Sequence, residues 1–191
     1  ILSKYLLNHF PAIEASTDFA YERFDYNDLE KTNYIQLNTI CADSSFFRIF
    51  PQESVVGNLQ QALQIAGNMV LTESSAVRLF GNVENAIGQK LENPLSRIFG
   101  ACTVIAVVRD SPENTNLPFD ALLNYPAVKD ASMIMPEPEQ WNYFNNSMYV
   151  KLRSQTDIDE LAEHLSDFTS QINTNPNIEL RLLPIVEVRH N

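Results

Sequence analysis

The alternation of hydrophobic and polar residues is clearest near the end of the chain. Apolar residues at every second position of 148–152 predict a strand, and apolar residues at helical spacing over 158–172 predict a helix. Thr156 stands three residues before an acidic side chain, which is typical of a helix start. A second alternating run over 178–188 completes a predicted strand–helix–strand unit, for which a right-handed crossover is the default.

The first fifty residues predict a helix followed by two strands. Apolar residues fall at helical spacing over 2–10, and Pro11 ends the run. Residues 12–21 and 35–41 alternate in the manner of strands, and the stretch 25–33 between them is polar and turn-like. The two strands are therefore expected to form an antiparallel hairpin.

The strongest local signal lies in the middle of the chain. Residues 69–71 predict a short buried strand, after which Thr72 can cap a helix and Glu73 is favoured in its first turn. Gly81 stands where a left-handed C-terminal cap belongs. Gly88 then precedes a new extended segment.

Weaker patterns predict the remaining elements. A short helix that Ser44 or Ser45 can cap precedes Pro51, and a second helix is expected to end near Gly67. The predicted elements are helices at 46–50 and 58–65 and strands at 101–108 and 119–123.

These elements together predict an α+β fold. The opening helix and hairpin and the closing strand–helix–strand unit would form one ferredoxin-like layer from residues 1–50 and 146–191. Residues 51–145 would form an inserted, strand-rich second lobe.

Charge and hydropathy exclude two classes of function. The net charge is −11, and the 13 Lys and Arg residues are scattered, so no nucleic-acid partner is expected. No apolar run approaches the roughly 20 residues that span a bilayer. Because no signal peptide or initiating methionine is present, Ile1 is expected to be a cut point in a longer protein.

Cys41 and Cys102 are the only cysteines of the chain, and both have apolar, strand-like surroundings. A free cysteine in such surroundings behaves as a small hydrophobe, so two buried thiols are favoured. A disulfide remains the alternative in an extracytoplasmic compartment.

The titratable residues do not form a recognisable catalytic or metal motif. His9, His164 and His190 have no paired spacing, and no serine or cysteine nucleophile motif or phosphate-binding loop is present. We therefore expect no enzyme activity, no cofactor and no metal.

Acidic residues gather around Pro112, where Asp110, Glu113 and Asp120 could lie near one another. A calcium loop would need a denser register of carboxylates than this stretch has. A loop that caps itself through the side chains of Asp110 and Asn114 is favoured over a metal site.

One stretch is a candidate contact surface. Residues 133–144 combine apolar density with prolines and show no clear period. Methionine and aromatic residues are enriched where proteins meet, although the stretch could equally fold back over the core of the second lobe. The candidate contact residues are Met133, Met135, Trp141, Tyr143 and Phe144.

Three stretches carry a resemblance to a known family. Residues 42–50 contain Asp-x-x-Phe-Phe-x-x-Phe, residues 72–88 contain Thr-Glu-Ser, Leu-Phe-Gly and Ile-Gly, and residues 107–120 contain a strand end followed by Pro-x-Asn-Thr. In this order they resemble the extracytoplasmic domain of MacB/FtsX-type ABC transporter permeases. Ala86 departs from the pattern, because the family usually has proline there. The matching residues, expected to be structural, are Asp43, Phe46, Phe47, Phe50, Thr72, Glu73, Phe80, Gly81, Gly88, Asp110, Pro112 and Asn114.

The resemblance implies a porter-like subdomain interrupted by a Sabre-like insert. It also implies a non-catalytic domain on the periplasmic side of the inner membrane, which relays ATP-driven motion to the export or release of envelope substrates. The implied partners are the transmembrane helices, a cytoplasmic ATPase, a second permease subunit, and an adaptor or lipoprotein. The alternative is a free-standing periplasmic or surface module that binds a peptide or glycan.

Overall fold

The computed structural model describes most of the 191-residue chain. The described residues are 2–28, 33–92, 100–112, 114–124, 147–154, 158–172 and 181–185. Their elements, in chain order, are α1 (Leu2–His9), β1 (Ile13–Asp28), β2 (Asn33–Ala42), α2 (Phe46–Ile49), β3 (Ser54–Gly57), α3 (Leu59–Ala62), β4 (Asn68–Thr72), α4 (Glu73–Phe80), the 3₁₀ turn η1 (Glu84–Ala86), β5 (Lys90–Leu91), β6 (Cys102–Val108), β7 (Ala121–Asn124), β8 (Ser147–Leu152) and α5 (Ile158–Ile172).

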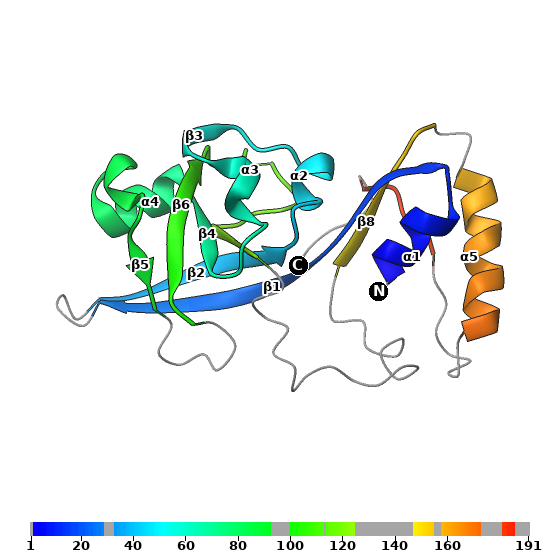
Figure 1. The fold of residues 1–191 in the computed structure, drawn as a ribbon, viewed down its shortest axis with the longest axis horizontal. Coiled ribbons are helices and arrows are strands. Elements are labelled where there is room, and N and C mark those ends of the chain that lie inside the picture. Colours follow the sequence, from blue (N-terminus) through cyan, green and yellow to red (C-terminus); the bar gives the residue numbers. More distant parts are fainter. Residues whose placement is uncertain are drawn as a thin grey trace.

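The described strands form one mixed sheet of eight strands, in the order β3-β6-β4-β7-β2-β1-β8, with β5 added beside β6 (Figure 1). β2 runs parallel to β7, and β4 runs parallel to β6. The other pairs are antiparallel. Helices α1 and α5 lie near the β8 end, and α4 lies at the opposite end (Figure 1). The predicted α+β fold class is confirmed.

Strand β1 is much longer than the sequence pattern predicts. It has 16 residues and continues through the stretch 25–28, which the polar pattern assigns to a turn. The prediction of a turn from residue 25 was therefore wrong. The ladder with β2 continues there because polar partners meet across it, as where the Gln36 amide donates to Asp25 Oδ1 at 3.0 Å. The predicted antiparallel hairpin itself is confirmed.

Both faces of the central strands are buried. Met69 and Leu71 belong to one cluster with Ala76 and Leu79 of α4. Val70, which points to the other face of β4, belongs to a second cluster with α2 and α3. Covering on both faces explains why β4 and β6 are nearly continuous apolar runs. A third, smaller cluster joins α1, the start of β1 and α5.

Several caps form as predicted, and others do not. Thr72 accepts a hydrogen bond from the Ser75 amide, and Gly81 takes the left-handed backbone with φ of 83°. The predicted helix over 58–65 is reduced to α3, which Asn58 caps. Ser45 makes no side-chain cap for α2. Instead, Asp43 Oδ1 accepts from the Ser45 amide at 2.8 Å and closes the preceding turn.

Part of the predicted closing unit lies outside the described residues. Residues 173–180 and 186–191 are not described, and 181–185 carry no strand. The right-handed crossover therefore stays a prediction. The division of the chain at residues 50 and 146 also stays a prediction, since β2 and β7, on either side of it, pair within one sheet.

Candidate functional site

Four aromatic rings meet where β1 passes from one partner strand to the next. Phe19 pairs both with Ala42 of β2 and with Ser147 of β8. Around it lie Phe46 of α2, Phe50 at the end of α2, and Tyr149 of β8. We call the set of Phe19, Phe46, Phe50 and Tyr149 the aromatic junction.

The rings of the junction are in direct contact. Phe19 meets Phe46 edge to face at 5.6 Å between centroids and stacks on Tyr149 at 5.4 Å with an interplanar angle of 5°. Phe50 closes the set, at 5.1 Å from Phe46 and 5.2 Å from Tyr149. Each such pair contributes roughly 0.5–1.5 kcal/mol beyond the burial of its area. The junction therefore ties β8 to β1 and α2 as one packed unit.

Short-range interactions hold the α2 rings in place. The Phe50 amide donates to the Phe46 carbonyl at 2.8 Å, and Pro51 then ends the helical turn. Phe47 contacts the edge of Phe46 at 5.9 Å and is partly buried against the same cluster. This arrangement explains why two adjacent phenylalanines and a third at residue 50 occur in one short segment.

Two rings of the junction are fully buried, and Phe50 and Tyr149 are half-buried. Phe19, Phe46 and Thr17 are fully buried, and within the described residues the Thr17 hydroxyl has no hydrogen-bond partner. Burial raises the pKa of Tyr149, and it raises the pKa of neighbouring Tyr21 to about 12. Both phenols are neutral at physiological pH, as an ordinary tyrosine is, and burial makes their ionisation still less favourable.

A polar network surrounds the N-terminal end of α4. Asp110 accepts hydrogen bonds from the amide and the hydroxyl of Ser74, with the amide at 3.0 Å. Partial burial raises its pKa, but the hydrogen bonds from Ser74 and Thr72 outweigh this and lower the pKa of Asp110 below its ordinary value. A carboxylate at a helix N-terminus is also favoured by the helix dipole. Asp110 thus joins the end of β6 to α4.

Asp120 binds the same helix from the other side. It accepts from the Ser75 hydroxyl at 3.3 Å and from the Asn38 amide at 2.9 Å. Arg78 lies 3.7 Å from it. Asp120 therefore joins α4 to β2.

The structure corrects the predicted self-capping loop. Asp110 binds Ser74, 36 residues away, rather than capping its own loop. The loop is closed instead by the Thr115 amide, which donates to the Pro112 carbonyl at 2.9 Å. Pro112 and Asn114 are exposed, and Glu113 lies outside the described residues.

Other signature residues make backbone, packing or ion-pair contacts around α4 and β6. The Gly88 amide donates to the Val104 carbonyl at 2.8 Å, with a φ of 82° at Gly88. Ala86, at the position where the family pattern has proline, is fully buried, and Phe80 packs against the same cluster. Glu73 occupies the first turn of α4 and lies 3.7 Å from Arg109.

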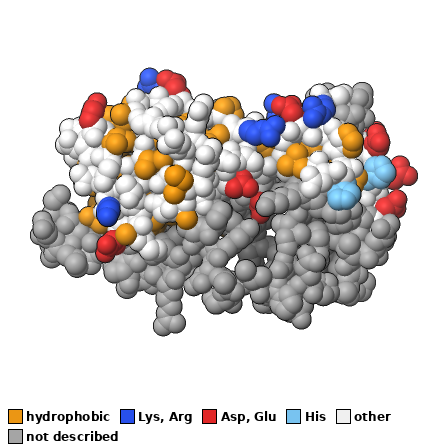
Figure 2. Space-filling view, in the orientation of Figure 1, with side chains coloured by type: hydrophobic (Ala, Val, Ile, Leu, Met, Phe, Trp, Pro, Cys, Tyr) orange, Lys and Arg blue, Asp and Glu red, His pale blue; other side chains and the backbone are white. Residues whose placement is uncertain are grey.

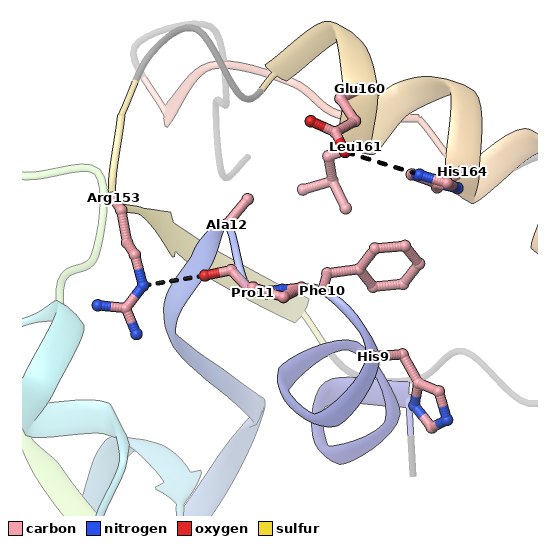
Figure 3. Close-up of a pocket in the computed structure, with 8 residues that line it drawn as sticks. All are labelled: His9, Phe10, Pro11, Ala12, Arg153, Glu160, Leu161 and His164. Atoms are coloured by element: carbon pink, nitrogen blue, oxygen red, sulfur yellow. Dashed lines mark hydrogen bonds and ion pairs between the residues drawn. The ribbon is translucent and has the colours of Figure 1, made fainter.

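A cleft of about 480 Å³ lies between α1, the start of β1 and α5 (Figure 3). His9 and His164, which have no paired spacing in sequence, both line it. Both are exposed, and His164 Nε2 lies 3.9 Å from Glu160. Within the described part of the chain, no group of three or more His, Cys, Asp or Glu side chains is placed to hold a metal ion.

The cysteines are two free thiols, each buried in the same apolar cluster. Burial raises the pKa of the Cys41 thiol well above its ordinary range and that of Cys102 to about 11. The favoured prediction of buried thiols is confirmed, and neither is a reactive thiolate.

Two predictions on contacts with the surroundings have different outcomes. The candidate contact residues Met133, Met135, Trp141, Tyr143 and Phe144 lie outside the described residues, so this surface stays a prediction. No helix in the described ranges is both long enough and apolar enough to cross a membrane.

Sequence reasoning missed the partners of the polar network. The sequence pattern gave no partner for Ser74 or Ser75, whereas in the structure their hydroxyls donate to Asp110 and Asp120. The one available signal was that Asp110 closely follows the predicted strand 101–108 and that Asp120 stands near the start of the predicted strand 119–123.

The chain matches the model of a known protein family. The model of one family, the MacB-like periplasmic core domain, matches residues 3–168. A comparison with curated protein sequences found no match.

The solved structures that share the fold include the following three. A domain assigned to a permease protein from Porphyromonas gingivalis is 21% identical, with a TM-score of 0.71 over 95% of this chain and 85% of that one. The periplasmic region of MacB from Actinobacillus actinomycetemcomitans is 16% identical, with a TM-score of 0.61 over 90% and 73%. The extracellular domain of the noncanonic ABC-type transporter YknZ from Gram-positive bacteria is 13% identical, with a TM-score of 0.60 over 88% and 83%.

Proposed function

The chain belongs to the family of MacB-like periplasmic core domains, and we propose that it relays ATP-driven motion as a stiff, non-catalytic unit. It is the extracytoplasmic domain of a MacB-type ABC transporter permease of the inner membrane, which works with an ABC ATPase. The relay would couple that ATPase to the export or release of envelope substrates outside the membrane.

The observation that carries this proposal is the long strand β1, which pairs with a different strand at each of its ends. Its first part pairs with β8, beside α1 and α5, and the rest pairs with β2 (Figure 1). Sixteen residues of strand span on the order of 50 Å. Because an extended strand cannot lengthen, displacement of one end is passed to the other.

The aromatic junction supports this role at the point where a hinge would otherwise form. At Phe19 the strand changes partners, so a bend there would separate the two ends of the sheet. Phe46 and Tyr149 pack on Phe19 from α2 and β8 and oppose such a bend. These rings would thus keep β1 straight where it changes partner strands.

We also propose the partners of the relay. A second permease subunit would lie opposite the domain, and an adaptor or lipoprotein would bind on the side away from the membrane. Residues 133–144 remain the candidate contact surface for one of them. The domain itself is proposed to have no catalytic activity and to bind no cofactor.

The relay is tested in the full permease with its ATPase, reconstituted in liposomes. A fluorophore attached at exposed residue 64 through Gln64→Cys reports its distance from acceptor dyes in the lipid headgroups. Native Cys41 and Cys102 are buried and do not compete for the label. ATP is expected to change the energy transfer in the otherwise unaltered permease.

The junction is tested with a matched pair of substitutions. Phe46→Ala is expected to keep ATP hydrolysis but lose the ATP-dependent signal, because the strand can now bend at Phe19. Phe80→Ala, made in α4 and outside the junction, is expected to keep both. An ATP-dependent signal that is equal in the two variants would refute the relay through the junction.

A further inference from the structure

A group of basic side chains, which we call the basic rim, lies on the surface of this acidic protein near the start of β1 and the end of β8. Three cations, Arg48, Lys151 and Arg153, surround the single carboxylate of Glu14. Lys151 Nζ lies 2.8 Å from Glu14 Oε1, and an Arg48 terminal nitrogen donates to the Glu14 carbonyl at 3.3 Å. The hydrogen bond from Lys151 and the charges of all three cations lower the pKa of Glu14. The rim therefore carries excess positive charge on a chain of net charge −11.

Arg153 belongs both to this rim and to the cleft between α1 and α5. Its amide donates to the Ala12 carbonyl and its Nε to the Pro11 carbonyl, each at 2.9 Å. These two bonds hold the guanidinium at the mouth of the cleft (Figure 3).

The rest of the cleft has an apolar floor. Leu161 points from α5 toward Phe10 and Ala12, and the ring of His164 lies 5.5 Å from that of Phe10 (Figure 3). Figure 2 shows hydrophobic side chains at the right of the view, between the Lys and Arg side chains and the histidines. An apolar hollow thus adjoins a basic rim.

We propose that this cleft docks a segment of a partner protein in which an apolar side chain is flanked on one side by acidic residues. The apolar side chain fills the space between Phe10, Ala12 and Leu161. The acidic residues contact Lys151 and Arg153, whose charge complements theirs. The volume of about 480 Å³ falls within the range of ligand sites in proteins.

The wall of the cleft that α5 forms, across from Arg153, determines the direction in which the partner segment binds. Glu160, Glu163 and Asp159 lie exposed on α5, where they repel further acidic residues. The acidic part of the partner must therefore lie toward Arg153, and the part that passes α5 is neutral or basic.

The lining fits a protein segment better than a lipid. An acyl chain would contact the polar side chains of Arg153, Glu160 and His164 without satisfying them. A peptide offers one apolar side chain to the floor and polar backbone groups to these side chains.

The docking proposal does not depend on the relay, because it concerns a surface outside the aromatic junction. It is tested by nuclear magnetic resonance on the ¹⁵N-labelled 191-residue chain. The probes are the blocked synthetic peptide Asp-Glu-Phe-Gly-Lys, the same sequence reversed, a version with glycine in place of phenylalanine, and decanoate. We expect shifts confined to residues 9–12, 151–153 and 160–164 with at least one of the two phenylalanine peptides, and none with the glycine peptide or decanoate.

Substitutions make the test specific. Lys151→Glu, which reverses one charge of the rim, is expected to weaken peptide binding by about tenfold. Lys90→Glu makes the same charge change on β5, far along the sheet, and is expected to leave binding unchanged. Ala12→Phe, which fills the floor, is expected to abolish the shifts.

Three results would overturn the proposal. The first is an equal response to the phenylalanine and glycine peptides, and the second is equal binding by Lys151→Glu and Lys90→Glu. The third is a response of the cleft to decanoate alone, which would assign the site to an amphiphile. Melting temperatures close to that of the unaltered chain confirm that the variants fold.

Discussion

At the scale of single residues, Phe46 is the ring through which α2 contacts Phe19 at the centre of the aromatic junction. It is fully buried and contacts Phe19, Phe47 and Phe50. Phe46→Ala is expected to lower the free energy of unfolding by about 3–5 kcal/mol, measured by urea denaturation. Phe80→Ala should cost less, because Phe80 is only partly buried. An equal loss in the two variants would contradict the assigned packing.

Asp110 gives a prediction on pH. Its folded-state pKa lies below the ordinary value of 3.8, so its stabilisation is complete above that value and is lost as the pH falls through the folded pKa. Between about pH 5 and about pH 2, the unaltered chain should therefore lose more stability than Asp110→Asn, which cannot titrate there. Parallel pH profiles of the two proteins, measured by urea denaturation, would show that the Ser74 contact contributes nothing.

Single residues also show where sequence reasoning works. Thr72 and Gly81 were placed correctly because a helix cap is decided by neighbours within four residues. The partner of Asp110 could not be found in this way, because Ser74 is 36 residues distant and reaches it only after β4 and β6 have paired.

At the scale of elements, β3 depends on one glycine. Gly57 has a φ of 89°, and a Cβ there would collide with the Ile105 carbonyl of β6. Gly81 has a similar φ of 83°, but a Cβ there would meet nothing within 4 Å. A comparison of substitutions at Gly57 and Gly81 therefore distinguishes the cost of backbone strain from the cost of a steric collision.

Gly81→Ala is therefore expected to cost about 1–2 kcal/mol of unfolding free energy, from its left-handed backbone alone. Gly57→Ala should cost clearly more, because β3 must also move away from β6. Urea denaturation of both variants checks the order. A smaller loss for Gly57→Ala would mean that β3 is not paired as described.

Elements were predictable where one face or one cap defined them. The alternation of apolar residues gave the position of β8, and apolar residues at helical spacing gave those of α1 and α5. The length of β1 was missed because polar residues such as Asp25 and Gln36 satisfy one another across the ladder. From the sequence alone, a run of polar residues such as 25–28 indicates a turn.

At the scale of the whole molecule, the order of the strands in the sheet could not be predicted from the sequence patterns. Nothing local indicates that β2 lies between β1 and β7, or that β4 separates β6 from β7. The predicted elements gave the α+β fold class, and the division at residues 50 and 146 stays a prediction, but neither indicated that β2 and β7 would pair. The aromatic junction was visible only as a run of phenylalanines whose partner, Phe19, lies 27 residues before Phe46.

The central claim is that the two ends of the sheet move as one body. It is tested most directly in the full permease with spin labels at exposed positions 64 and 163, introduced through Gln64→Cys in the turn after α3 and Glu163→Cys on α5. Pulsed electron paramagnetic resonance then measures the distance between them with and without ATP. We predict one narrow distance distribution that ATP leaves unchanged and that Phe46→Ala broadens. A distribution that is broad or bimodal in the otherwise unaltered permease, or that shifts with ATP, would contradict the account.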